Sequence, residues 1–115
     1  MTGERIGLLG GTFNPVHFGH LQLACAAMKE CGLNRVIFIP SAQPPHKDEN
    51  TIASYADRVA MLQIACGVDK HFAFTKIEGD LPTPSYTIDT LRTLSDGFGG
   101  DVIFFFIIGV DAFLD

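Results

Sequence analysis

Short apolar runs alternate along the chain with segments whose apolar residues recur every three or four positions. The runs predict β-strands over residues 5–9, 35–40, 72–76 and 102–108. The segments with helical spacing predict α-helices over residues 19–31, 55–66 and 85–95. Strands and helices alternating in this order predict an α/β fold, in which a parallel sheet of about four strands carries helices on both faces.

The ends of the predicted helices carry residue types that commonly start or stop a helix. Gly32 follows the first helix and suits a C-cap, whereas Ser54 precedes the second and suits an N-cap. The third helix is expected to stop before Gly97. The apolar residues that these helices would bury are Leu21, Ala24, Met28, Cys31, Val59, Leu62, Cys66, Ile88, Leu91 and Leu94.

Segments rich in glycine, proline or polar residues follow the predicted strands. They are residues 10–11, 41–50, 77–84 and 109–111. Ligands on parallel sheets bind beyond the carboxyl ends of the strands, so these segments predict a single pocket. The connection at residues 41–54 is the longest and most polar, which predicts a mobile lid.

The stretch Gly-Gly-Thr-Phe-Asn-Pro-Val-His-Phe-Gly-His at residues 10–20 indicates the chemistry of that pocket. It joins a strand to a helix N-terminus, where unpaired N–H groups and a partial positive charge favour an anion. Gly10 and Gly11 would let the backbone approach that anion closely. His17 and His20 stand three residues apart at the helix entry and would point imidazole donors at it. The stretch therefore predicts a polyphosphate site.

Other interpretations of these residues remain open. The two histidines could be surface or capping residues, or half of a zinc site, although zinc takes three or four ligands and only His46 and His71 remain to supply them. The glycines could form a tight strand-to-helix turn without a ligand. A dinucleotide site of the G-x-G-x-x-G type is disfavoured, because Gly7, Gly10 and Gly11 do not fit that spacing.

Composition narrows the class of protein. A chain of 115 residues, 47% hydrophobic and 18% charged, predicts one globular domain rather than a disordered segment. A net charge of −5 disfavours a nucleic-acid partner, which would need a basic face. The longest apolar run, residues 102–108, is far shorter than the roughly 18 residues of a membrane span, and no secretory leader is visible.

The cysteines bear on compartment and on redox chemistry. Cys25, Cys31 and Cys66 are an odd number without C-x-x-C spacing, which disfavours metal or redox chemistry. All three lie in helical patterns beside apolar residues, so we expect buried, reduced cysteines. That expectation favours a cytoplasmic location.

Several motifs resemble those of a known enzyme family. Residues 10–20 resemble the signature of the nucleotidyltransferase superfamily, in which a (His/Thr)-x-Gly-His motif binds the α- and β-phosphates of a nucleoside triphosphate. Three further segments are similar, in order and spacing, to bacterial nicotinate-nucleotide adenylyltransferase: Pro44-Pro45-His46-Lys47, Pro84-Ser85-Tyr86-Thr87 and Phe106-Ile107-Ile108-Gly109-Val110-Asp111. Asn14 stands where that family more often has Asp, and the family's Ile-Ser-Ser-Thr-x-Ile-Arg-like motif has no counterpart here.

The resemblance implies a Rossmann-like nucleotidyltransferase fold that lacks the family's C-terminal strand and helices. It implies transfer of AMP from ATP to nicotinate mononucleotide, giving deamido-NAD and pyrophosphate, with Mg²⁺ bound through the ATP phosphates and no metal held by side chains. The catalytic residues would be His17 and His20. These two would also bind ATP, together with Gly10, Gly11, Thr12, Phe13, Gly109 and Asp111. The acceptor nucleotide would be bound by His46, Lys47, Ser85, Tyr86 and Thr87.

Simpler roles compete with several of these assignments. Lys47 could be a solvated loop charge, residues 85–87 could cap a helix, and Asp111 could be the N-cap of a following helix. The activity has rivals too. They are adenylyl transfer to nicotinamide mononucleotide or to phosphopantetheine, and a catalytically silent nucleotide-binding module.

Residues 1–115 are expected to form a single nucleotidyltransferase domain that is the N-terminal part of a longer family member. Without the family's C-terminal arginine motif, weak ATP binding and little turnover are expected. The strand at 102–108 would keep an unpaired apolar edge, which predicts homo-oligomers formed through it. The expected partners are ATP and nicotinate mononucleotide, with no nucleic acid and no membrane.

Overall fold

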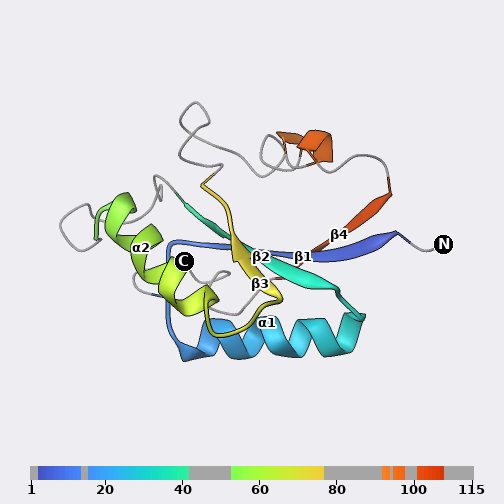
Figure 1. Ribbon diagram of the computed structural model, residues 1–115, viewed down its shortest axis with the longest axis horizontal. Coiled ribbons are helices and arrows are strands. Elements are labelled where there is room, and N and C mark those ends of the chain that lie inside the picture. Colours follow the sequence, from blue (N-terminus) through green and yellow to red (C-terminus); the bar gives the residue numbers. More distant parts are fainter. Residues whose placement is uncertain are drawn as a thin grey trace.

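The computed structural model describes residues 3–13, 16–41, 53–76, 92–93, 95–97 and 101–107. The strands are β1 (Glu4–Gly11), β2 (Arg35–Pro40), β3 (Phe72–Phe74) and β4 (Val102–Phe106), and the helices are α1 (Phe18–Cys31) and α2 (Tyr55–Cys66). All strand pairs are parallel, and the sheet has the order β3-β2-β1-β4 (Figure 1). The predicted α/β architecture is confirmed.

Element boundaries follow the sequence prediction closely in the middle of the chain and less closely elsewhere. β2 and α2 have the predicted bounds, and α1 begins one residue earlier than predicted. β1 continues to Gly11, whereas β3 and β4 each end two residues earlier than predicted. Most of the predicted third helix lies outside the described residues. Residues 92–93 and 95–97 are helical, so this helix includes Gly97 instead of stopping before it.

The two faces of the sheet bury different sets of side chains. One face packs against both α1 and α2, through a cluster that includes Leu9, Phe38 and Leu62. The opposite face carries a smaller cluster, with Ile6, Leu8, Ile37 and Ile39 at its centre. Figure 1 shows α1 on one side of the sheet and the helical residues 92–93 and 95–97 on the other. Helices on both faces were predicted, and this arrangement agrees with that.

Local signals at the helix ends act as predicted. Gly32 ends α1 in the left-handed conformation, with φ of 62°, and donates its N–H to the Met28 carbonyl. The Ser54 hydroxyl oxygen accepts a hydrogen bond from the Asp57 N–H at 3.1 Å, which caps α2. These caps satisfy backbone groups that each helix end leaves unpaired.

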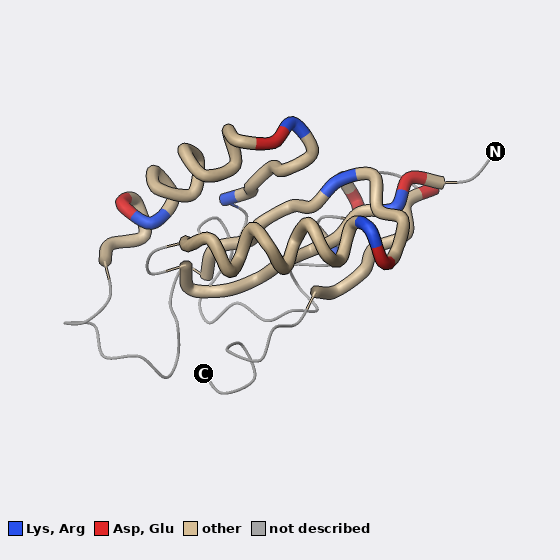
Figure 2. The backbone as a smooth tube through the Cα atoms, turned by 90° about the horizontal axis from the view of Figure 1, so that it is seen from below, with Lys and Arg blue, Asp and Glu red and all other residues tan. Residues whose placement is uncertain are grey.

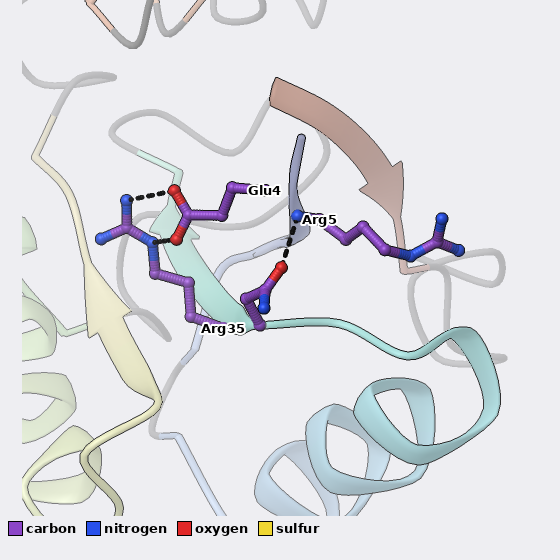
Figure 3. Close-up of polar contacts among 4 residues, drawn as sticks. Glu4, Arg5 and Arg35 are labelled. Atoms are coloured by element: carbon purple, nitrogen blue, oxygen red, sulfur yellow. Dashed lines mark hydrogen bonds and ion pairs between the residues drawn. The ribbon is translucent and has the colours of Figure 1, made fainter. Parts of the chain in front are cut away.

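Charged residues gather near the amino ends of β1 and β2 (Figure 2). Figure 3 shows the Glu4–Arg35 ion pair, at 3.1 Å, beside the bond from the Arg5 N–H to the Asn34 side chain, at 2.7 Å. The Arg5 guanidinium donates twice to the Cys31 carbonyl, at 3.0 and 2.8 Å, and so holds the last turn of α1 against β1. The carboxyl ends of the strands, where a ligand is expected, lie at the other end of the sheet.

The cysteines differ in burial, which corrects the prediction that all three are buried. Cys66 is buried and Cys31 is partly buried, but Cys25 is exposed. Cys25 follows Ala24, the buried position of α1, so the 100° step of a helix turns its side chain toward solvent. All three are free thiols.

Cys66 makes folded stability sensitive to alkaline pH. Burial raises the pKa of its thiol from 9.0 to about 11. The thiol therefore ionises first in the unfolded chain, so we expect the contribution of Cys66 to stability to be constant well below pH 9 and to fall as the pH rises from 9 toward 11. Urea unfolding measured between pH 8 and 10.5 would test this, with Cys66→Ala as control. An equal fall in stability in Cys66→Ala and in the unchanged chain would show that other groups cause the effect.

Candidate active site

The chain leaves β1 at Phe13 rather than at the glycines. Gly10 and Gly11 are the last residues of β1 and pair with Ile39 and Pro40, so the prediction that this strand ends at residue 9 was wrong. Phe13 then takes a φ of 51°, a left-handed conformation that costs a non-glycine residue about 1 kcal/mol. Its side chain is only 2% exposed, and burial of a phenylalanine contributes about 1.5–3 kcal/mol, which offsets that cost.

The ring of Phe13 links this turn to the core. It lies 5.7 Å from the Phe38 ring and meets the His20 ring edge-on, with centroids 4.9 Å apart. Phe38 in turn lies 5.5 Å from Phe72 of β3. His20 therefore rests against a row of buried rings that crosses the sheet, and only the backbone of Phe13 is left for the predicted role in ATP binding.

His17 and His20 cap the first turn of α1 with their own side chains. His17 is the N-cap residue, and its Nδ1 accepts a hydrogen bond from the Gly19 N–H at 3.1 Å. The Nδ1 of His20 accepts from the His17 N–H at 3.0 Å. These reciprocal bonds form a capping box. The capping interpretation of the two histidines is confirmed.

Capping decides which ring nitrogen carries the hydrogen. A nitrogen that accepts a hydrogen bond keeps its lone pair, so the neutral imidazoles of His17 and His20 carry their N–H at Nε2. The two rings lie close together, with centroids 3.9 Å apart and planes 31° apart. His17 is exposed and His20 is partly exposed. Capping therefore uses Nδ1 of each ring and not Nε2.

Gly19, for which no role was predicted, explains the spacing of the His-x-Gly-His stretch. A Cβ on Gly19 would lie 2.9 Å from Cε1 and 3.0 Å from Nδ1 of His17. The His17 ring can reach the Gly19 N–H only because that Cβ is missing. A glycine two residues after a histidine was therefore a signal in the sequence that the histidine caps the helix, since a capping ring needs room over the first turn.

The electrostatics of this helix entry favour an anion. The chain has no charged residue between Ile6 and Met28, and α1 has no acidic residue in its first turn. Figure 2 shows this stretch of tube without red or blue. An acidic side chain there would compete with a bound phosphate for the positive end of the helix dipole.

A zinc site finds no support in the part of the chain that the structure describes. There, no group of three or more His, Cys, Asp or Glu side chains is placed to hold a metal ion. His71 lies just before the amino end of β3, where its Nδ1 is 2.8 Å from Oδ1 of Asp69. That end of the sheet is opposite the helix entry of His17 and His20.

Arg58 of α2 reaches the site and was not identified from the sequence. It is 2% exposed, and burial lowers the pKa of its guanidinium, an effect that Tyr55 partly opposes. Its Nη1 donates to the carbonyls of Thr12, at 2.8 Å, and Ser41, at 2.7 Å, while its Nε donates to the Ala53 carbonyl at 3.0 Å. The sequence did contain a signal that Arg58 is buried, because Arg58 shares a helix face with the buried Leu62, four residues later.

The family model described as cytidylyltransferase-like matches residues 8–115, which includes all of these site residues. The chain belongs to the cytidylyltransferase-like family. Among curated relatives of this cytidylyltransferase-like chain, a protein of Desulfotalea psychrophila named "probable nicotinate-nucleotide adenylyltransferase" is 48% identical over 97% of the chain and 54% of its own length. A Geobacter sulfurreducens protein of the same name is 46% identical over 96% of the chain and 51% of its length.

A solved structure agrees on the fold. Nicotinic acid mononucleotide adenylyltransferase of Plasmodium falciparum, complexed with NaAD, superimposes with a TM-score of 0.70 at 14% identity. The match covers 90% of this cytidylyltransferase-like chain and 50% of that one. The nucleotidyltransferase-type, Rossmann-like fold is thereby confirmed. The chain spans about half the length of the relatives it matches.

The structure describes one side of the predicted pocket. Gly10, Gly11, Thr12, Phe13, His17 and His20 lie together at the carboxyl end of β1 and the entry to α1. Outside the described residues lie His46, Lys47, Ser85, Tyr86, Thr87, Gly109 and Asp111. Most of the predicted lid at 41–54 also lies outside them. No described helix of this cytidylyltransferase-like chain is long and apolar enough to cross a membrane.

Gly10 provides a test of ligand approach to the loop. A Cβ there would meet nothing closer than the Ile39 carbonyl oxygen at 3.8 Å, so the fold itself does not require glycine. We expect Gly10→Ala to change folded stability by less than about 1 kcal/mol, yet to weaken ATP binding about tenfold, because the methyl group would occupy ligand space. Calorimetric titration with ATP and thermal unfolding would measure both.

Gly7 is the matched control for Gly10. A Cβ on Gly7 would lie 2.8 Å from Cδ1 of Leu33 and 2.9 Å from Cδ1 of Ile107. Gly7→Ala should therefore lower stability by about 1–3 kcal/mol through overpacking. If Gly10→Ala binds ATP as tightly as the unchanged chain, the glycines serve strand pairing alone.

Proposed function

We propose that the chain is part of an enzyme that transfers AMP from ATP to nicotinate mononucleotide, releasing pyrophosphate and giving deamido-NAD. The names of relatives 48% and 46% identical support this activity. We further propose that residues 1–115 form one nucleotidyltransferase domain, the N-terminal part of a longer protein. The coverage of about half of each relative's length supports that assignment.

The capping geometry of His17 and His20 is the observation that carries the proposal. Both rings accept backbone N–H bonds at Nδ1, so in the neutral imidazoles the N–H donor is at Nε2, at a helix N-terminus without acidic residues. Such donors suit the α-phosphate of ATP and the leaving pyrophosphate. They hold their orientation before the substrate arrives, which is the requirement for stabilising charge that develops in the transition state.

The reaction needs alignment rather than a nucleophilic side chain. A phosphate oxygen of nicotinate mononucleotide attacks the α-phosphorus of ATP, and the bond from that phosphorus to the bridging oxygen breaks as pyrophosphate leaves. The protein brings two anions together and neutralises their charge. In this proposal His17 and His20 donate to the phosphates, while Gly10, Gly11, Thr12 and the Phe13 backbone border the ATP.

Mg²⁺ fits this site as an ion held by the triphosphate. The chain has no carboxylate between Ile6 and Met28, so the described loop offers N–H donors rather than metal ligands. When bound, the ion would neutralise phosphate charge. His17 and His20 would then complement it from the protein side.

The remaining assignments concern residues outside the described part of the chain. We propose that His46, Lys47, Ser85, Tyr86 and Thr87 bind the acceptor nucleotide, and that Gly109 and Asp111 bind adenosine. The exclusion of nucleic-acid partners stays a prediction from the net charge of −5. A cytoplasmic location is also proposed, and the three free cysteines support it.

Self-association through β4 is a further part of the proposal. β4 is the edge strand of the described sheet, and Ile103 and Phe106 on it are 49% and 50% exposed. A half-exposed apolar edge strand favours pairing with a second copy. Light scattering should show dimers or larger species, and a monodisperse monomer at high concentration would contradict this.

Pyrophosphate release tests the proposed activity. ATP and Mg²⁺ would be supplied with nicotinate mononucleotide, nicotinamide mononucleotide or phosphopantetheine in parallel assays. Release with the nicotinate acceptor alone is expected, at the low rate predicted for residues 1–115 without the C-terminal arginine motif, and faster release with another acceptor would favour that rival transferase. ATP binding by calorimetry without release under any acceptor would favour a silent nucleotide-binding module. Absence of ATP binding would contradict the proposal altogether.

A further inference from the structure

We propose that Arg58 is a positioning residue for nucleotide binding, one that orients the peptide between Thr12 and Phe13 so that the Phe13 N–H faces the triphosphate. This inference rests on the proposed function. Arg58 comes from α2, far along the chain from the phosphate stretch, and its position in the fold is what brings it to the loop.

Arg58 holds three separate pieces of backbone together. One nitrogen, Nη1, donates to Thr12 just beyond β1 and to Ser41 just beyond β2, at 2.8 and 2.7 Å. Nε donates to Ala53, just before α2, at 3.0 Å. Ser41 itself extends the pairing of the strands, because its N–H donates to the Gly11 carbonyl at 2.8 Å. The guanidinium thus sets the end of β1 against the end of β2 and the start of α2.

The bond to Thr12 also sets the direction of the next amide. In a trans peptide the C=O and the following N–H point in opposite directions. Since the Thr12 carbonyl points to the Arg58 guanidinium, inside the protein, the Phe13 N–H points the other way. Phe13 has a positive φ, which among the described residues it shares only with a glycine. Its backbone therefore departs from the strand conformation directly after the Thr12–Phe13 peptide.

Side-chain packing keeps that peptide from relaxing. The Phe13 ring is 2% exposed and contacts the ring of His20, so the loop cannot rotate without disturbing the core and the histidine. Arg58 and Phe13 therefore fix the same peptide from its two ends. A donor fixed in this way suits a phosphate oxygen between the end of β1 and the cap of α1.

Arginine meets this need and lysine does not. The guanidinium is a planar fork whose nitrogens bond several acceptors in fixed directions, whereas the lysine ammonium is a single point donor on a flexible stem. Arg58→Lys keeps the positive charge but cannot bond Ala53 and Thr12 with two separate nitrogens. Arg58→Met keeps much of the length and removes both charge and donors.

The test compares these variants by calorimetric titration with ATP and Mg²⁺. We expect the Kd for ATP to rise about tenfold in Arg58→Lys, the usual cost of one misplaced hydrogen-bond donor to a charged group, and further in Arg58→Met. Val59→Ala is the control, because Val59 is the next residue of α2 and is also buried. If Arg58 only stabilises the fold, Val59→Ala should raise the Kd for ATP as much as an Arg58 variant that has the same thermal midpoint. That result would overturn the proposal.

A measurement on the unchanged chain keeps the proposal testable if the variants fail to fold. Nitrogen-15 amide spectra with and without ATP should show the Phe13 N–H among the most shifted signals, as expected for a direct donor. An unshifted Phe13 amide at saturating ATP would overturn the role of Arg58 and leave the proposed function standing. A chain that binds no ATP would overturn both.

Discussion

Replacing His20 by asparagine is expected to lower the rate of pyrophosphate release about 100- to 1,000-fold. Asparagine places its Oδ1 close to the position of the histidine Nδ1, so it can still accept the His17 N–H and keep the cap of α1. It has no group at the position of Nε2. The variant therefore removes the donor proposed for the phosphates while leaving the helix entry in place, and the loss should appear mainly in kcat.

Glutamine at the same position is the matched comparison. Its side-chain amide reaches the position of the histidine Nε2 but leaves the His17 N–H without the cap acceptor seen at 3.0 Å. We expect His20→Gln to lose about 1 kcal/mol of stability through the cap, and to retain more activity than His20→Asn. Initial rates, thermal midpoints and the Kd for ATP would be measured on both variants.

The opposite order of activities would contradict the role given to Nε2, because it would mean that the cap matters more than the donor. In a nucleotide-binding module without turnover, His20→Asn would raise only the Kd for ATP. The two variants thus separate an enzyme from a binding module, and within an enzyme they separate chemistry from helix capping.

Replacing Phe38 by alanine is expected to destabilise the fold by about 3–5 kcal/mol, a large part of the roughly 5–15 kcal/mol typical of a domain. Phe38 is fully buried in β2, and its ring lies between those of Phe13 and Phe72. Its removal leaves a cavity behind the turn that carries Phe13. Denaturant unfolding would report the loss as a lower midpoint with an unchanged slope.

Phe106→Ala is the control for the cavity. Phe106 is the same residue type in a strand of the same sheet, but it is 50% exposed on the edge strand β4. Its loss should cost well under half as much as that of Phe38, since much of its surface already contacts water. Equal destabilisation by the two substitutions would show that Phe38 does not occupy the central position described above.

Local rules predicted the features that depend on neighbouring residues. The period of the apolar residues and Ser54 placed α2 at its observed bounds, and Gly32 marked the end of α1. The phosphate stretch was identified in the same way, because its glycines and histidines lie within eleven positions of one another. Each of these features is decided within one or two turns of backbone.

Predictions failed where distant contacts outweigh local preference. Two glycines in succession favour a turn, but pairing with β2 keeps Gly10 and Gly11 in β1. Phe13 disfavours positive φ, yet burial of its ring against Phe38 compensates for that conformation. Cys25 lies in an apolar stretch and was predicted to be buried, but it is exposed because α1 turns the opposite side toward the sheet.

The sequence by itself determined the order of the described strands and helices, the C-cap of α1 and the N-cap of α2, and it placed the proposed anion site at the entry to α1, because these depend on residues close together in the chain. Only the tertiary structure decided the strand order β3-β2-β1-β4, the place of Phe13 in the core and the bond from Arg58 to Thr12, which joins residues 46 positions apart. Contacts of that separation form only when the sheet and helices pack, and a pattern of apolar and polar positions does not specify which partner a buried guanidinium meets.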